Sequence, residues 1–187
     1  MITSIESYSE KLRQALHLLP NQAISLFFDK VLSLWQTNGQ IFICGNGGSA
    51  ANALHLSNDL FFGVAKNRGR GIRAHALPSN QPVMTCLSND LSYGEVFSSQ
   101  LDLLANPGDI LIVLSGSGNS TNILNVLKKA KELKVTSVAI LGYAGGSALE
   151  LADIPIHVPV HDMQISEDLQ MVIGHSLMQW LRECNPS

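Results

Sequence analysis

Two acid and histidine pairs in this sequence are spaced for metal binding or for proton transfer. His55 and Asp59 are four residues apart, so they share one face of the helix predicted to carry them. Glu167 and His175 lie two turns apart on a predicted apolar closing helix. Two imidazoles and two carboxylates are a ligand set that suits a divalent ion such as Zn²⁺. Taken alone, His55 and Asp59 could instead form an exposed helical ion pair of little consequence.

Two glycine loops that each follow a buried strand could bind an anion. The loop 45–48 (GNGG) separates the apolar run 41–44 from a helix that starts at Ser49, and the loop 115–120 (SGSGNS) separates the apolar run 110–114 from another helix. Backbone N–H groups and the positive end of the helix dipole attract anions at such helix starts. The second loop adds three serine hydroxyls, which could surround a phosphate without any lysine or arginine. Neither loop has the GxGxxG or GxxxxGK(S/T) spacing, which disfavours a nicotinamide or ATP site.

Alternating strands and helices are expected to position these groups on one sheet. Residues 61–71 are predicted as a basic loop without periodicity. The order of elements predicts an α/β fold, with a five-stranded parallel sheet in a flavodoxin-like three-layer sandwich and ligands beyond the carboxyl ends of the strands. Residues 1–38 are predicted to form a leading pair of helices for oligomerisation, ahead of one domain at 39–187. Strands are predicted at 41–44, 72–77, 109–114, 135–141 and 154–158, and helices at 3–18, 24–35, 49–60, 83–89, 96–104, 122–133, 147–152 and 166–183.

The composition indicates a well-packed globular protein. The 187 residues are 45% hydrophobic and 14% charged, which disfavours disorder. The net charge of -3 and the scattered basic residues disfavour nucleic-acid binding. Cysteines 44, 86 and 184 lack CxxC spacing, so they indicate neither a disulfide framework nor a cysteine zinc site. The amino-terminal segment lacks a signal-peptide pattern and no apolar run approaches the ~20 residues that span a bilayer, so a cytoplasmic protein without membrane contact is expected.

Several segments together resemble the sugar isomerase (SIS) domain family, and within it the phosphoheptose isomerase branch. They are GNGGS with His55 and Asp59, the SND at 88–90, the strand followed by SGSGNS, and the closing helix with Glu167 and His175. The resemblance covers nearly the whole chain, including the leading helices. It implies an aldose-ketose isomerase that converts D-sedoheptulose 7-phosphate to D-glycero-D-manno-heptose 7-phosphate, through an enediol, in heptose biosynthesis for lipopolysaccharide or capsule. It also implies a homotetramer with active sites at subunit contacts, and zinc, which many members bind.

The resemblance further implies roles for individual residues. Asp59 would be the base and His175 the acid partner, with Glu167 as the alternative base. One Zn²⁺ per subunit would be held by His55, Asp59, Glu167 and His175. The phosphorylated sugar would be bound by Asn46, Gly47, Gly48, Ser49, Asn89, Asp90, Ser115, Gly116, Ser117 and Ser120.

Two positions depart from the family pattern. Asp59 stands where better-known members have glutamate, which shortens the side chain by one methylene. Glu167 stands where they have glutamine, which adds a negative charge and should strengthen binding of a divalent ion. Two other functions stay open: a catalytically inactive tetramer that acts as a protein-binding scaffold, such as a replication-initiator-associating factor, and an isomerase of another sugar phosphate. Retention of both histidines and both carboxylates favours the enzyme, because a scaffold does not require them.

Overall fold

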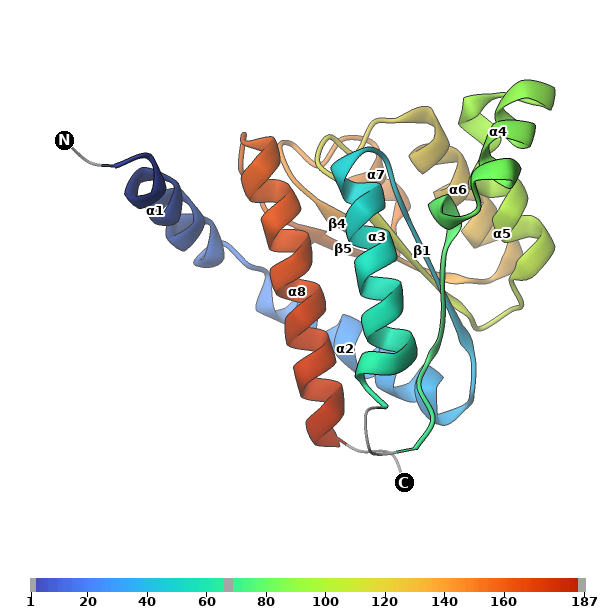
Figure 1. Ribbon diagram of the computed structural model, residues 1–187, viewed down its shortest axis with the longest axis horizontal. Coiled ribbons are helices and arrows are strands. Elements are labelled where there is room, and N and C mark those ends of the chain that lie inside the picture. Colours follow the sequence, from blue (N-terminus) through green and yellow to red (C-terminus); the bar gives the residue numbers. More distant parts are fainter. Residues whose placement is uncertain (1–2, 66–68, 185–187) are drawn as a thin grey trace.

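Five parallel strands form one sheet in the computed structural model, which describes residues 3–65 and 69–184 (Figure 1). Their order is β2-β1-β3-β4-β5, so β2 lies on one side of the central β1–β3 pair, and β4 and β5 lie on the other. Ile41 lies opposite Ile110 and Gly45 opposite Leu114, which brings the ends of β1 and β3 to the same edge. This order confirms the predicted flavodoxin-like sheet. The strands are β1 (Gln40–Gly45), β2 (Arg73–Ala76), β3 (Ile110–Ser115), β4 (Thr136–Leu141) and β5 (Ile154–His157).

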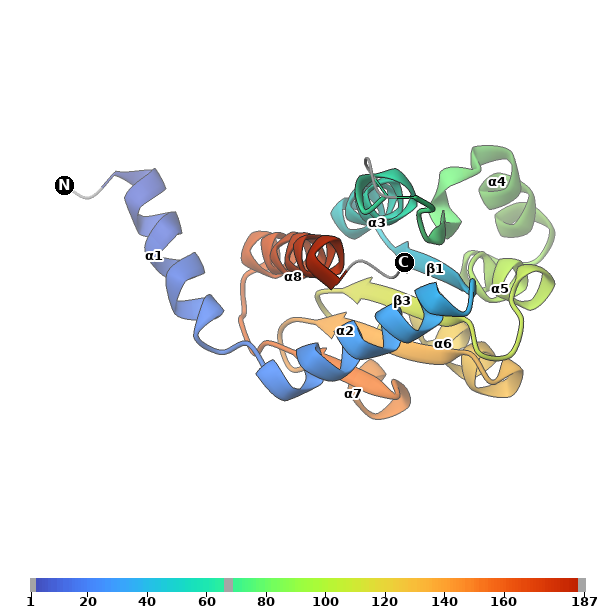
Figure 2. The same cartoon turned by 90° about the horizontal axis from the view of Figure 1, so that it is seen from below.

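Helices cover both faces of the sheet, which confirms the predicted three-layer α/β sandwich (Figure 2). In β3, Ile112 faces the layer of α2, α3 and α8, while its neighbour Val113 faces α5, α6 and α7. Successive side chains of a strand point to opposite faces, so a strand covered on both sides needs the unbroken apolar run found here. None of the helices in the described ranges is long and apolar enough to cross a membrane. The helices are α1 (Ser4–Leu16), α2 (Asn21–Gln36), α3 (Gly48–Asn58), α4 (Gln81–Asp90), α5 (Ser98–Leu104), α6 (Thr121–Leu133), α7 (Ala148–Leu151) and α8 (Met163–Cys184), with short turns η1 (Asp59–Gly63), η2 (Leu77–Ser79) and η3 (Tyr93–Glu95).

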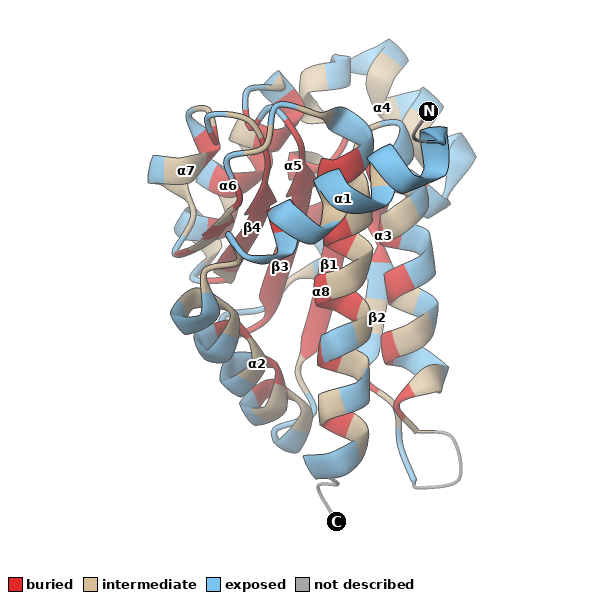
Figure 3. Cartoon of the chain, turned by 90° about the vertical axis from the view of Figure 1, so that its left-hand side faces the viewer, coloured by how far each residue is buried: buried red, intermediate tan, exposed pale blue. Residues whose placement is uncertain are grey.

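Helices α3 and α8 run side by side, and both start at the carboxyl edge of the sheet (Figures 1 and 3). They pack closely where Leu56 lies against Gly174, because a Cβ atom on residue 174 would overlap the Leu56 side chain. Glycine at this position therefore allows the two helices to pack closely enough for other side chains along them to meet.

The two leading helices are attached in different ways (Figure 2). Helix α2 buries one face in the core beneath the sheet. Helix α1 extends away from the sheet and lies against the start of α8. There the Tyr8 hydroxyl donates to Asp168 Oδ2 at 2.7 Å, and Lys11 pairs with Asp162 at 3.3 Å. Helix α2 is thus part of the layered domain, and the oligomerising role of residues 1–38 stays a prediction.

The prediction of a loop at 61–71 is partly wrong, because α3 continues into one turn of π-helix, η1 (Asp59–Gly63). The Val64 N–H donates to the Asp59 carbonyl at 2.9 Å, the five-residue spacing that characterises such a turn. The sequence places no glycine or proline between Asp59 and Gly63, so the helical path extends over Phe61 and Phe62. Residues 66–68 of the predicted loop lie outside the described residues.

Candidate active site

Two loops predicted to bind an anion lie next to each other at the carboxyl edge of the sheet. The turn 46–48 joins β1 to α3, and the loop 115–120 joins the neighbouring strand β3 to α6. Gly47 has φ of 56°, a region that glycine adopts without strain. The first N–H groups of α3 and α6 point into the space beyond the strand ends, where an anion would be stabilised. Residues 46–49, residues 115–120 and Glu167 are together termed the anion half.

The three serines of the second loop have different surroundings. Ser115 is buried, and its Oγ accepts a hydrogen bond from the Gly118 N–H at 3.1 Å, which folds the loop back on itself. Ser117 is exposed, with a longer bond of 3.4 Å from the Asn119 N–H. Ser120 is the N-cap residue of α6 without a side-chain capping bond. Ser115 therefore fixes the shape of the loop, while Ser117 and Ser120 present hydroxyl groups that a ligand could use.

Asn46 is held by two residues that the sequence analysis missed. Its amide exchanges two hydrogen bonds of 2.9 Å each with Asn122, on the first turn of α6. The Tyr93 hydroxyl, in η3, donates to Asn46 Oδ1 at 2.8 Å. Asn122 is only 2% exposed, so a polar residue on the buried face of a predicted helix was the signal that could have found it.

Asn89 and Asp90 form the exposed end of α4. Asn89 Nδ2 donates to Asp90 Oδ1 at 2.8 Å, and Cys86 Sγ lies 3.4 Å from Asp90 Oδ2. These bonds, first that from Asn89 and then that from Cys86, lower the pKa of Asp90 below its ordinary value. Three residues later, Tyr93 connects this segment to the anion half through Asn46.

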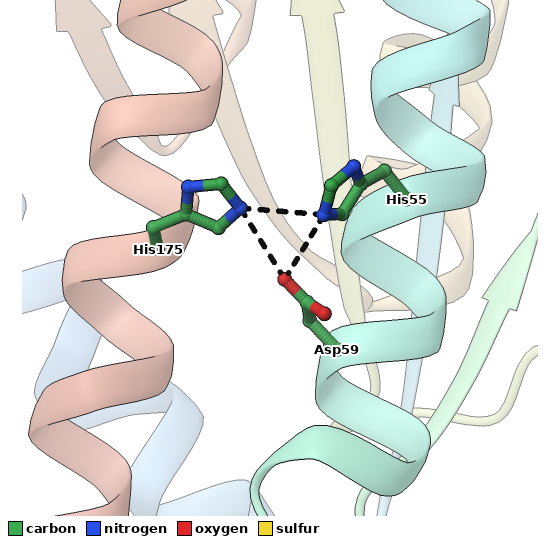
Figure 4. A group of neighbouring side chains, drawn as sticks. All are labelled: His55, Asp59 and His175. Carbon is green, nitrogen blue, oxygen red and sulfur yellow. Dashed lines mark hydrogen bonds and ion pairs between the residues drawn. The ribbon is translucent and has the colours of Figure 1, made fainter.

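His55, Asp59 and His175 converge on one point between α3 and α8 (Figure 4). The two Nε2 atoms are 3.3 Å apart, and Asp59 Oδ2 lies 3.5 Å from each of them. Zinc–ligand distances of about 2.0–2.2 Å place two ligand atoms of a tetrahedral ion about 3.3–3.6 Å apart. The triangle therefore has the dimensions of a divalent site with three protein ligands. His55, Asp59 and His175 are together termed the imidazole half.

A buried polar ladder aligns α3 with α8. Gln170, which is 1% exposed, donates from Nε2 to Ser49 Oγ at 3.0 Å and accepts from Asn52 Nδ2 at 2.9 Å. Asn52 also donates to the backbone carbonyl of Glu167 at 3.0 Å. The Ser49 hydroxyl thus binds the neighbouring helix. Because a buried polar group is costly to leave unpaired, these bonds favour one register of the helices, the register in which His175 meets His55.

Glu167 lies with the anion half and away from the imidazole half. Its carboxylate packs against Gly48, where a Cβ atom would overlap it. Eight residues of helix separate Glu167 from His175, which is about 12 Å at 1.5 Å per residue. Gly116 contacts Met163, which precedes His175 by twelve residues, or about 18 Å of the same helix. One chain therefore brings three of the four predicted metal ligands together and keeps the fourth beside the glycine turn.

The chain is similar over most of its length to known proteins. A family model described as the SIS domain matches residues 5–142. The chain is 35% identical over 174 residues to a phosphoheptose isomerase of Helicobacter pylori (strain P12), a match that covers 93% of this chain and 84% of that protein. Among solved structures, a phosphoheptose isomerase from Francisella tularensis has a TM-score of 0.89 at 28% identity and covers 96% of both chains. One from Neisseria gonorrhoeae has a TM-score of 0.86 at 27% identity and covers 95% of both chains.

Proposed function

The chain belongs to the SIS-domain family, as one of its phosphoheptose isomerases, and we propose from this premise how its residues divide the reaction. It isomerises D-sedoheptulose 7-phosphate to D-glycero-D-manno-heptose 7-phosphate in heptose biosynthesis. The carbonyl moves from C2 to C1: a base takes a proton from C1 while an acid protonates O2, and the resulting enediol then gains a proton at C2 and loses the O1 proton. The convergence of His55, Asp59 and His175 is the observation that carries the proposed division of roles.

Two subunits complete each site in this proposal. An extended seven-carbon sugar phosphate spans about 10 Å from C1 to phosphorus, since three bonds of a chain span about 3.3–3.6 Å. The serine loop of one chain is about 18 Å along α8 from His175 of the same chain, which is too far. The anion half of one subunit would therefore face the imidazole half of a neighbour, in a homotetramer. Exposed apolar side chains on the leading helices and their connection, at Ile5, Leu16, Leu18 and Leu26, support a contact role for residues 1–38.

One Zn²⁺ per subunit fits the imidazole half. His55, Asp59 and His175 would hold it through the three atoms that already form a triangle of 3.3 to 3.5 Å. Glu167 from a neighbouring subunit would supply a further oxygen. Its negative charge would bind a divalent ion more strongly than the neutral amide of a glutamine would. A zinc ion bound there polarises carbonyl and hydroxyl oxygens of the substrate.

The proton transfers fall to the same residues. Asp59 takes the C1 proton through Oδ1, because Oδ2 is the atom in the triangle and the other oxygen points away from it (Figure 4). His175 moves the hydroxyl proton, and Glu167 is the alternative base. Asn46, Gly47, Gly48, Asn89 and Asp90 would bind the sugar, and Ser115, Gly116, Ser117 and Ser120 would bind its phosphate, so that orientation contributes to the rate.

A mixed-subunit assay tests this proposal. His175→Ala and Glu167→Ala proteins should each lose activity towards sedoheptulose 7-phosphate. When the two chains are co-expressed, about a quarter of the sites combine an intact anion half with an intact imidazole half, so about a quarter of the activity should return. No recovery in the mixed protein would contradict a site shared between subunits. A wild-type protein without bound metal and without turnover would contradict the enzyme and favour the scaffold.

A further inference from the structure

Tyr93 and Asn122 both bind the side-chain amide of Asn46, the first residue after β1 and part of the anion half. We propose that they are positioning residues, which fix the Asn46 amide so that it presents an N–H donor to the substrate. The inference rests on the proposed function, which places the sugar phosphate against residues 46–48. Tyr93 is 54% exposed and Asn122 is 2% exposed, so one reaches Asn46 from the surface and the other from the core.

The hydrogen bonds that Asn46 makes with the described residues leave one group of its carboxamide unused. A carboxamide has two acceptor lone pairs and two N–H hydrogens. Asn46 Oδ1 accepts from Tyr93 at 2.8 Å and from Asn122 at 2.9 Å, which uses both lone pairs. Asn46 Nδ2 donates one hydrogen to Asn122 Oδ1 at 2.9 Å. The remaining N–H is the group that Asn46 offers to a ligand, and its partner is an accepting oxygen, such as a phosphate or carbonyl oxygen.

Asn122 does not select this orientation by itself. If both amides of the pair turn over, every nitrogen and oxygen changes place and both hydrogen bonds are kept. Tyr93 breaks this symmetry, because a phenol hydroxyl donates more strongly than it accepts and so favours the amide oxygen over the amide nitrogen at the position 2.8 Å away. The same three residues also join three segments, since Asn46 follows β1, Tyr93 lies in η3 and Asn122 lies in the first turn of α6. The phenol thus sets the polarity of a contact that Asn46 makes.

Tyr93→Phe removes the hydroxyl group and keeps the exposed ring. We expect KM for sedoheptulose 7-phosphate to rise about three- to tenfold, the effect of one hydrogen bond. We expect kcat to change by less than about twofold, because the amide binds the substrate and does not react. The thermal midpoint should stay the same. Tyr8→Phe is the matched control, because it removes a phenol hydrogen bond to Asp168 and should leave KM unchanged.

Two further variants separate polarity from simple contact. Asn46→Asp keeps the acceptor that faces Tyr93 and Asn122 Nδ2 but replaces Nδ2 by an oxygen. This removes both the donor to Asn122 Oδ1 and the remaining N–H, so KM should rise more than about tenfold. An Asn46→Asp protein with wild-type KM would overturn the donor assignment. In the Asn46→Ala background, Tyr93→Phe should cause no further rise in KM, because Tyr93 acts through Asn46. An additive rise would mean that Tyr93 contacts the substrate directly, and it would overturn the positioning role.

Calorimetric binding of sedoheptulose 7-phosphate keeps this inference separate from the enzyme assignment. If the wild-type protein binds the sugar phosphate without turning it over, the proposed function fails. The Kd of Tyr93→Phe relative to wild type then still decides the role of Tyr93. A Kd about three- to tenfold higher, the effect of one lost hydrogen bond, supports the positioning role. Equal Kd values overturn it. A wild-type protein that does not bind the sugar phosphate overturns both.

Discussion

The anion half and the imidazole half both use residues of α3 and α8 but are built in opposite ways. The anion half consists mainly of backbone turns, fixed by the pairing of β1 with β3 and by bonds such as that from Gly118 to Ser115. The imidazole half consists of three side chains on two helices, and the His55 and His175 side chains are 54% and 44% exposed. Local sequence can specify a backbone turn, whereas a set of side chains on two helices depends on how the helices are aligned. We therefore expect that each half can be damaged without the other.

The largest expected effect is the loss of one imidazole. His175→Ala should lower kcat/KM by about 10²- to 10⁴-fold, because it removes the proposed acid, and bound zinc should be lost with its ligand. The Kd of inorganic phosphate should stay the same, because the serine loop belongs to the anion half. His17→Ala, which removes an exposed histidine at the end of α1, is the control and should leave all three values unchanged. A His175→Ala protein that keeps its zinc and activity would contradict the metal set, and one that loses phosphate binding would show that the halves are coupled.

A smaller effect is expected from a change in how closely the helices pack. In Gly174→Ala the new Cβ atom overlaps Leu56, so α3 and α8 must move apart. Overpacking costs about 1–3 kcal/mol of unfolding free energy, partly offset by the roughly 1 kcal/mol that alanine gains over glycine in a helix. Zinc affinity should fall, and phosphate affinity should not. Urea unfolding and the two titrations measure these changes.

Leu56→Ala provides the matched rescue of Gly174→Ala. The double variant loses the core packing of Leu56, so its unfolding free energy should be lower still. Its zinc affinity should nevertheless return towards the wild-type value, because the overlap that separates the helices is gone. If Gly174→Ala leaves zinc affinity unchanged, the close contact does not set the geometry of the imidazole half.

The sequence was sufficient for the parts of the molecule that depend on neighbouring residues. The apolar run at 110–114 and the glycine and serine loops are local features, and both the sheet and the family resemblance that they predicted are confirmed. The alignment of α3 with α8 was not predictable, because Gln170 and Gly174 acquire their roles only when the two helices are paired. The sequence spacing of Glu167 and His175 already placed the two residues about 12 Å apart along one helix. The prediction of a common metal site did not take this separation into account. Zinc, the tetramer and the cytoplasmic location stay predictions.

The smallest expected effect concerns the attachment of α1 to α8, next to the anion half. Burial of the Tyr8 phenol and its hydrogen bond to Asp168 raise the pKa of Tyr8 from 10.0 to about 12. The folded protein therefore keeps the phenol proton in a range where the unfolded chain loses it. The stability that this contact contributes is complete below pH 10.0 and is lost as the pH rises to about 12.

Thermal unfolding across this alkaline range, in wild type and in Tyr8→Phe, measures the contribution. The wild-type midpoint should fall more steeply than that of Tyr8→Phe, because the variant has no phenol at this position to ionise. Two equal slopes would assign the alkaline loss to groups other than Tyr8. At neutral pH the zinc affinities of the two proteins should agree, since the Gln170 ladder and the Leu56 contact that align the imidazole half lie further along α8 than Asp168. A difference in zinc affinity would instead mean that the start of α8 must be held by α1 before His175 can meet His55.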